Sequence, residues 1–395
     1  MKRENLILVI ILMVMTGCGE SNKQSTVIRS NDDLITVDVT KSYPKKELIL
    51  QDFMDVEYIP LETTNEFLTQ GYVFAVGREV IVVTNYSRDG DIFIYDRNGK
   101  GVRKINRKGQ GGEEYPDIMG IVLDEDNDEL FVHERKMRVY DLNGNFKRSF
   151  NFRSGYMFTR YYNYDRDHFI AYDYTVEIEE DAGFKKRSAY NVILSKHDGS
   201  IIREIQIPIK KKISTFLQVR TDDRILSTSI RNINEMIPYH GNWILTLPSA
   251  DTVYTYLPDN SLLPFIARTP SIQTMKPEVF LLPQVFTEQY YFMRVVEKGS
   301  FNDEDQFPTN NLVYDRQEQK MYECKVYNDD FTTKKTINMS QQRRVDSEIA
   351  FCQMHEASSL IEAYNNGELK GRLKEIATGL KEDDNPVIML VKNRK

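Results

Sequence analysis

Two short polar clusters have residue types and spacings that could bind a ligand directly. Gly109-Gln110-Gly111-Gly112 could cradle a phosphate, but a phosphate loop must lead into a helix, and here Pro116 and a strand pattern follow. Asp124–Glu129 resembles the start of a calcium loop, which also needs glycine at its sixth position and glutamate at its twelfth. Glu129 and Arg135 occupy those positions instead. We interpret the first cluster as a tight connection and the second as a solvated turn, with weak calcium binding as the alternative.

The sequence contains no complete catalytic motif. Its 5 histidines are widely separated, and it has no HExxH helix, no paired Cys/His spacing and no GxSxG elbow. Ser42 and Lys45 match SxxK, which we interpret as a chance match ahead of the first repeat. We therefore predict no catalytic residue, no cofactor and no resident metal. A metal held by distant histidines that meet at a shared axis is the alternative.

The candidates for ligand contact come from the Gly-rich connection and from a tyrosine cluster, Tyr161-Tyr162-Asn163-Tyr164. Aromatic rings beside amides can stack on a sugar or a peptide. Strands also favour tyrosine, so packing between neighbouring sheets is the alternative interpretation. The predicted ligand-binding residues are Arg107, Gln110, Glu114, Tyr115, Tyr162 and Tyr164.

Repeated β-hairpins must position these side chains. Ile92–Ile105 reads IFIYDRNGKGVRKI and Met137–Phe150 reads MRVYDLNGNFKRSF, with further copies at Val192–Ile205 and Leu312–Cys324 and a looser one at Val253–Ile266. Each copy is an alternating strand, a polar turn and a second alternating strand. The copies recur roughly every 45–60 residues, which is typical of propeller blades. The sequence thus predicts an all-β, six-bladed β-propeller over residues 32–395, with the fourth blade starting near Phe216.

A closed ring removes exposed sheet edges, so one N-terminal strand should complete the last blade. We expect Leu34–Val39 to lie there beside the C-terminal strand Val387–Val391. A small helical insertion, residues 358–381, should interrupt this blade, because Leu369, Leu373 and Ile376 follow a helical stripe.

The N-terminus has the features of an export signal. Lys2 and Arg3 precede the apolar stretch Leu6–Met15, which is too short to span a bilayer. Met15-Thr16-Gly17-Cys18 resembles the lipobox of bacterial lipoproteins. This resemblance implies cleavage after residue 17, lipidation of Cys18 and a membrane anchor, with residues 18–31 as a flexible tether. An uncleaved anchor or a plain secretory signal is the alternative.

The net charge bears on the class of partner, and the cysteines bear on disulfide formation. The net charge of −7 argues against a nucleic-acid partner. Beyond Cys18, the chain has Cys324 and Cys352, which could pair in an oxidising compartment or remain free.

The chain resembles the Bacteroides-type six-bladed β-propeller lipoproteins, whose blades are similar to NHL repeats. Gly109–Phe150 and the C-terminal LKEDDNPVIMLVK carry this resemblance. It implies the architecture and a place in the cell envelope, with the outer membrane favoured. We therefore predict a non-enzymatic binding or scaffolding lipoprotein whose partner is a glycan, a peptide or an envelope protein. The alternative is a propeller lyase or hydrolase with a metal or carboxylates in its central channel, which rests on fold analogy.

Overall fold

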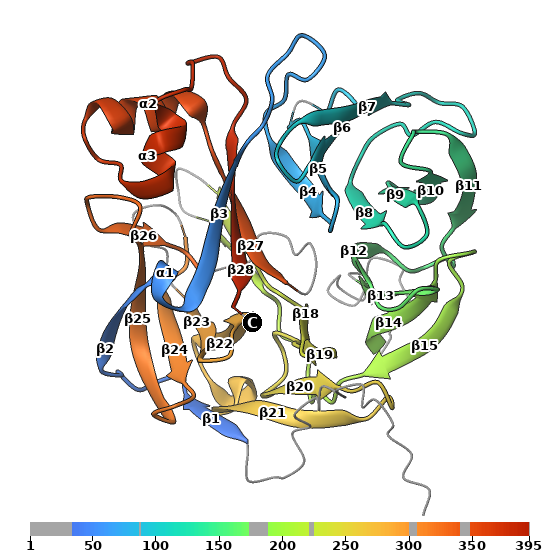
Figure 1. Ribbon diagram of the computed structural model, residues 1–395. Coiled ribbons are helices and arrows are strands. Elements are labelled where there is room, and N and C mark those ends of the chain that lie inside the picture. The colour runs from blue at the N-terminus through green and yellow to red at the C-terminus, as the bar shows by residue number, and fades with distance from the viewer. Residues whose placement is uncertain are drawn as a thin grey trace, which may run out of the picture.

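The computed structural model describes residues 34–86, 88–173, 189–220, 225–299, 306–339 and 348–394. Its sheets are arranged around a central axis as a six-bladed β-propeller, which confirms the predicted fold class (Figure 1). Five blades have the order of a four-stranded meander. The sixth combines two C-terminal strands with one strand from the N-terminal part of the chain.

The first three blades follow one another along the chain. The first contains β4 (Tyr72–Val76), β5 (Val80–Thr84), β6 (Asp91–Asp96) and β7 (Gly101–Asn106). The second contains β8 (Gly120–Asp124), β9 (Glu129–His133), β10 (Lys136–Tyr140) and β11 (Phe146–Asn151). The third contains β12 (Phe158–Asn163), β13 (His168–Asp173), β14 (Ala189–Ser195) and β15 (Ile201–Gln206).

The remaining blades carry additions. The fourth contains β18 (Met236–Tyr239), β19 (Asn242–Leu245), β20 (Thr252–Tyr256) and β21 (Leu262–Thr269). The fifth contains β22 (Glu278–Phe286), β23 (Tyr290–Lys298), β24 (Thr309–Asp315) and β25 (Lys320–Asn328), and β26 (Lys335–Ile337) pairs with β25. A separate hairpin, β16 (Phe216–Arg220) and β17 (Ile225–Ser229), precedes β18. The predicted start of the fourth blade near Phe216 is therefore wrong, because these strands pair only with each other among the described residues.

The repeated phrase folds as expected from its turn residues. Asp96 accepts hydrogen bonds from two backbone N–H groups of its turn, and Asp141 does the same in the second blade. Gly99 and Gly144 follow in the left-handed region, each with φ of 84°. A Cβ on Gly99 would lie 2.1 Å from the carbonyl oxygen of Pro60, so this turn also needs glycine for close packing against the sixth blade.

The sixth blade consists of β27 (Ile349–His355), β28 (Val387–Asn393) and β3 (Met54–Pro60). The prediction that Leu34–Val39 closes the ring is wrong. That segment forms β1 (Ile35–Asp38), which lies parallel to β21 at the outer edge of the fourth blade. Likewise, β2 (Lys45–Ile49) lies parallel to β25, and the short helix α1 (Leu50–Phe53) then leads into β3.

The burial of β3 explains why it closes the ring. Tyr58 belongs to a core cluster that includes residues of the fifth blade, whereas Ile59 belongs to a cluster shared with the first blade. The strand that closes the ring thus packs against both neighbouring blades, whereas β1 lies at the outer edge of one blade. The alternation in Leu34–Val39 could not distinguish these two positions.

The helical insertion is confirmed. Helices α2 (Ala357–Asn365) and α3 (Gly371–Ala377) connect β27 to β28 and lie at the rim of the ring (Figure 1). Leu369, Leu373 and Ile376 are buried in the same cluster as Tyr58, so the insertion extends the core of the closing blade.

Candidate functional site

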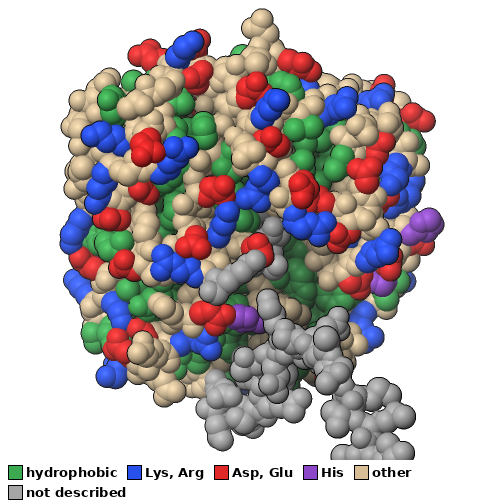
Figure 2. All heavy atoms as spheres, viewed as in Figure 1, with side chains coloured by type: hydrophobic (Ala, Val, Ile, Leu, Met, Phe, Trp, Pro, Cys, Tyr) green, Lys and Arg blue, Asp and Glu red, His purple; other side chains and the backbone are tan. Residues whose placement is uncertain are grey.

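A wide cavity lies where the inner strands of several blades meet. Its volume is about 840 Å³. Strands β4, β8, β12 and β27 contribute to its wall, together with the connection before β18 and a residue of β23. In the space-filling view, hydrophobic side chains are visible in a hollow near the middle of the face, while acidic and basic side chains are interspersed around it (Figure 2). We call this cavity the axial pocket.

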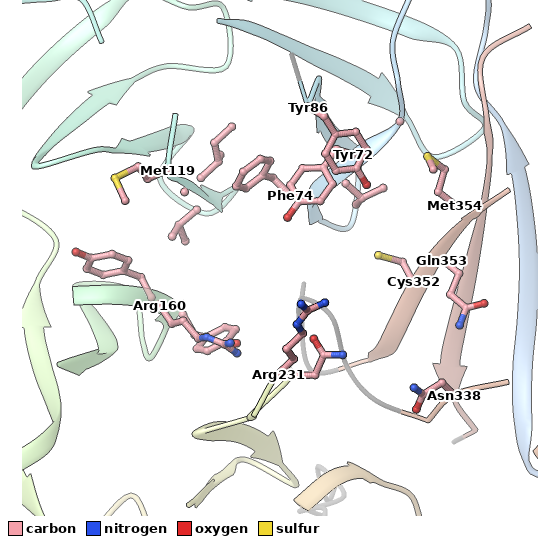
Figure 3. A pocket seen from close by; sticks show the side chains of 18 of the residues that line it. Tyr72, Phe74, Tyr86, Met119, Arg160, Arg231, Asn338, Cys352, Gln353 and Met354 are labelled. Atoms are coloured by element: carbon pink, nitrogen blue, oxygen red, sulfur yellow. The ribbon is translucent and has the colours of Figure 1, made fainter. Parts of the chain in front are cut away.

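Three arginines line the axial pocket: Arg160 of β12, Arg231 before β18, and Arg294 of β23. No aspartate or glutamate is among its described lining residues. In Figure 3, Arg160 and Arg231 lie on one side of the pocket. The lining of the axial pocket is therefore positively charged, although the protein as a whole has a net charge of −7.

Arg294 is partly buried and held by backbone oxygen atoms. Its Nη2 donates to the carbonyl oxygens of Arg231 and Asn232. Its Nε is buried and has no hydrogen-bond partner among the described residues. Burial lowers the pKa of Arg294 to about 10, so the guanidinium still carries its charge at neutral pH.

The other two arginines differ in their neighbours. Arg160 forms an ion pair of 3.3 Å with the buried Glu235. Burial alone would lower the pKa of Arg160, but the Glu235 carboxylate raises it overall. Arg231 is exposed, and neither it nor Arg294 forms an ion pair within the described ranges. Arg231 and Arg294 therefore supply the positive charge that no described carboxylate offsets.

Aromatic rings form the opposite side of the axial pocket in Figure 3. Tyr72 contacts Tyr86 at 4.6 Å between ring centroids and Phe74 at 5.1 Å. Tyr161 and Tyr162 of β12 complete the aromatic lining. The pocket therefore combines flat apolar surfaces with charged hydrogen-bond donors.

Amide side chains fill much of the remaining wall. Each amide can both donate and accept hydrogen bonds, so it can satisfy a ligand that does the same. The amide residues of the lining are Asn232, Gln306, Asn338 and Gln353.

Of the six predicted ligand-binding residues, only Tyr162 lines the axial pocket. Tyr164 instead packs against Trp243 and Tyr256 in a cluster of the third and fourth blades. Tyr115 is completely buried, and its hydroxyl donates to the carbonyl oxygen of Gly90. These two contacts match the alternative interpretation, packing between blades.

The other three predicted residues lie in the connection from β7 to β8, outside the axial pocket. Arg107 Nε donates to the carbonyl oxygen of Gly144, and the Glu114 carboxylate accepts from the N–H of Gly111. Gln110 is exposed. Ligand binding by these side chains remains a prediction, but they would not share a site with Tyr162.

The acidic cluster that resembled a calcium loop has other partners. The Glu125 carboxylate accepts from the N–H groups of Arg78 and Glu79, while Asp126 forms an ion pair of 2.6 Å with Arg78. These contacts join the first blade to the second. Among the described residues, no group of three or more His, Cys, Asp or Glu could hold a metal ion.

The remaining sequence predictions concern the two cysteines and the membrane anchor. Cys324 and Cys352 form no disulfide in the part of the chain that the structure describes, and the Cys352 sulfur points toward the axial pocket (Figure 3). Cys18, the signal segment and the tether lie outside the described residues. Within the part of the chain that the structure describes, no helix is long and apolar enough to cross a membrane.

The three arginines were not among the predicted site residues, although the sequence contains one indication of them. Arg294 interrupts the apolar strand YYFMRVVEK between Met293 and Val295. A charged residue within a buried strand needs a partner, a cavity or a ligand. Arg231 stands in a connection and has no comparable pattern.

The fold has relatives among solved structures. A Bacteroides fragilis NCTC 9343 protein that is named as exported matches with a TM-score of 0.61 and 12% identity, over 92% of this chain and 100% of its own. At that identity the likeness shows the fold alone.

Two other matches have TM-scores too low to support an argument. A Bacteroides caccae protein of unknown function has a TM-score of 0.33 at 11% identity, covering 64% of this chain and 81% of its own. A Staphylococcus aureus virginiamycin B lyase has 0.30 at 11%, covering 65% and 88%.

No curated protein matches the chain. A family model does match, over residues 34–392, and this range includes all six blades. The chain therefore belongs to the family described as Domain of unknown function (DUF4934).

Proposed function

We propose that this protein is a cell-envelope lipoprotein that binds an acidic oligosaccharide in its axial pocket without transforming it. The observation that carries the proposal is the set of three arginines in a pocket with no acidic residue among its described lining. Guanidinium groups bind carboxylates and sulfates through paired, charge-assisted hydrogen bonds. Arg231 and Arg294 form no ion pair within the described ranges, so their charges are available to such an anion.

The rest of the lining favours a carbohydrate over a peptide. Sugar hydroxyls both donate and accept hydrogen bonds, as amide side chains do. The rings of Tyr72, Phe74 and Tyr86 offer flat surfaces for the apolar faces of sugar rings. A volume of about 840 Å³ is ample for more than one sugar ring.

Export and lipid anchoring complete the proposal. The lipobox-like sequence ending at Cys18 supports lipidation, and the exported relative from Bacteroides fragilis is consistent with a place in the envelope. The NHL-like repeats also resemble those of the Bacteroides-type propeller lipoproteins, which supports the same location. A lipid anchor and a flexible tether would hold the ring at the membrane surface, with the outer membrane favoured.

The test is retention of oligosaccharides by the purified full-length protein. The panel contains galacturonate and chondroitin sulfate oligosaccharides, each beside a neutral counterpart made by methyl esterification or by desulfation with carboxyl reduction. We expect an acidic oligosaccharide to be retained and its neutral counterpart to be lost. Equal retention of both forms, or of neither, would overturn the proposal, and shortened products would favour the alternative of a lyase or hydrolase.

A further inference from the structure

A second cavity of about 330 Å³ adjoins the axial pocket. It lies between the β5–β6 and β7–β8 connections of the first blade. The two cavities share four wall residues: Tyr72, Phe74, Tyr86 and Met119. A ligand that extends out of the axial pocket past these residues would enter the second cavity directly.

The shared wall is unusually apolar for a surface. Tyr86 is 58% exposed and Met119 is 57% exposed, although both are large hydrophobic residues. Both border the two cavities, and Figure 3 shows them above Arg160 and Arg231. Exposed apolar side chains that flank a cavity are typical of binding sites.

Hydrogen bonds fix the backbone around Tyr86 before any ligand binds. Its backbone N–H donates to the side-chain oxygen of Gln70 at 2.6 Å. The neighbouring Asn85 accepts from the hydroxyl of Thr69 and from the N–H of Gln70. The Tyr86 ring also packs on Tyr72. Preorganisation of this kind lowers the entropic cost of binding.

The far side of the second cavity differs from the axial pocket in charge. Its one lining arginine, Arg88, already forms an ion pair of 3.1 Å with Asp117. Asp89 and Asp91 also line it, and the Asp91 carboxylate forms an ion pair with Lys104. This cavity therefore suits the ring faces and hydroxyls of a sugar more than its acidic groups.

We infer that the second cavity is a subsite for a further ring of the same oligosaccharide, stacked on Tyr86 and Met119. This inference rests on the proposed function. It adds that the ligand is a chain of several sugar rings, whose acidic group binds in the axial pocket while a neighbouring ring occupies the second cavity.

The test is the dependence of affinity on ligand length. Isothermal titration of the full-length protein uses partly methyl-esterified galacturonate and unsulfated chondroitin oligosaccharides of two, four and six rings, so that each series has uncharged rings beside acidic ones. In the series that the protein retains, we expect the four-ring ligand to bind about tenfold more tightly than the two-ring ligand, which is the effect of one added aromatic contact. Tyr86 borders both cavities, so Tyr86→Ala should weaken binding of the four-ring ligand more than that of the two-ring ligand and thereby reduce this gain, whereas Tyr86→Phe should keep it.

The control variant is Ile202→Ala, because Ile202 is 54% exposed on β15 and lines neither cavity. It should leave affinities for all lengths unchanged. Equal affinity for two and four rings, or an equal loss at every length in Tyr86→Ala, would overturn the subsite and leave the proposed function standing. If no acidic oligosaccharide of any length binds, both proposals fail.

Discussion

At the scale of single residues, the two arginines of the axial pocket without a described carboxylate partner differ in how firmly their side chains are held. Arg294 is fixed by the carbonyl oxygens of Arg231 and Asn232, so its guanidinium is already oriented. Arg231 is exposed and can adjust to the ligand. An anion would therefore meet one rigid donor group and one mobile one.

Arg231→Ala should weaken acidic oligosaccharide binding by about tenfold or more, because a hydrogen bond to a charged group contributes about 1.5–3 kcal/mol. The melting temperature should stay unchanged. Arg294→Lys should also weaken binding, since an ammonium keeps the charge but loses the planar donor fork. Isothermal titration and thermal melts measure both effects.

The control for these variants is Arg135→Ala, since the Arg135 side chain is 92% exposed and outside the axial pocket. It removes one positive charge without touching the site. If Arg135→Ala and Arg231→Ala weakened binding equally, the effect would come from net charge and the axial pocket would not be the site.

The buried His133 and the half-buried His355 should make stability depend on pH. Burial lowers the pKa of His133 to about 4, and burial together with Lys335 lowers the pKa of His355 to about 4. In the unfolded chain each histidine titrates near 6.5, so the unfolded state binds protons first as the pH falls. Stability is therefore full above pH 6.5 and declines toward pH 4.

His133→Phe removes one of these two groups and should reduce the decline by about 3 kcal/mol at pH 4. Urea denaturation of both proteins at pH 7.5, 6, 5 and 4 measures the difference. An unchanged pH dependence in the variant would show that His133 is protonated in the folded protein.

At the scale of elements, the junction between the last and first blades depends on one buried amide. Asn385 precedes β28, and its side chain donates to the carbonyl oxygens of Glu62 and Phe67. It also accepts from the N–H of Thr69. This residue therefore fixes the segment after β3 to the segment before β28.

Asn385→Ala should lower the free energy of unfolding by about 3 kcal/mol or more, because three backbone groups lose their partner and each costs about 1–3 kcal/mol. Asn310→Ala is the matched control, since Asn310 is exposed on β24. A urea titration compares the two. A loss below about 1 kcal/mol in Asn385→Ala would mean that water replaces the amide.

Ring closure by β3 gives a second prediction at this scale. A chain that starts at residue 45 lacks only β1, so it should melt at a lower temperature but in one cooperative step. A chain that starts at residue 62 also lacks β2, α1 and β3, and the residues of β3 pair with β28 from Val387 to Asn393. This longer truncation should abolish cooperative melting. Similar melting curves for both would contradict closure by β3.

At the scale of the whole molecule, local patterns predicted the blades but not their assembly around the axis. The hairpin phrase, its Asn-Gly turns and the helical stripe near Leu373 depend on neighbouring residues, and all appear in the structure. The axial pocket instead joins Tyr72 to Arg294 and Met354, which are far apart in sequence. Spacing within one repeat cannot show which positions face the axis.

The proposed envelope location gives a further prediction for the whole molecule. A diacyl anchor contributes about 0.8 kcal/mol per buried methylene, so the mature protein should fractionate with membranes. Cys18→Ser should release the protein or leave an unprocessed precursor. Immunoblots of soluble and membrane fractions measure this. A variant that fractionates and migrates like the wild type would contradict lipidation at Cys18.

The axial pocket is proposed to recognise the negative charge of an oligosaccharide. Isothermal titration tests this with the acidic oligosaccharide that the protein retains best and with its neutral counterpart, at increasing sodium chloride. We predict that the acidic form binds at least about tenfold more tightly and that salt reduces this difference, because ions screen exposed charges. Equal affinities for the two forms, or an advantage that salt does not change, would contradict the claim.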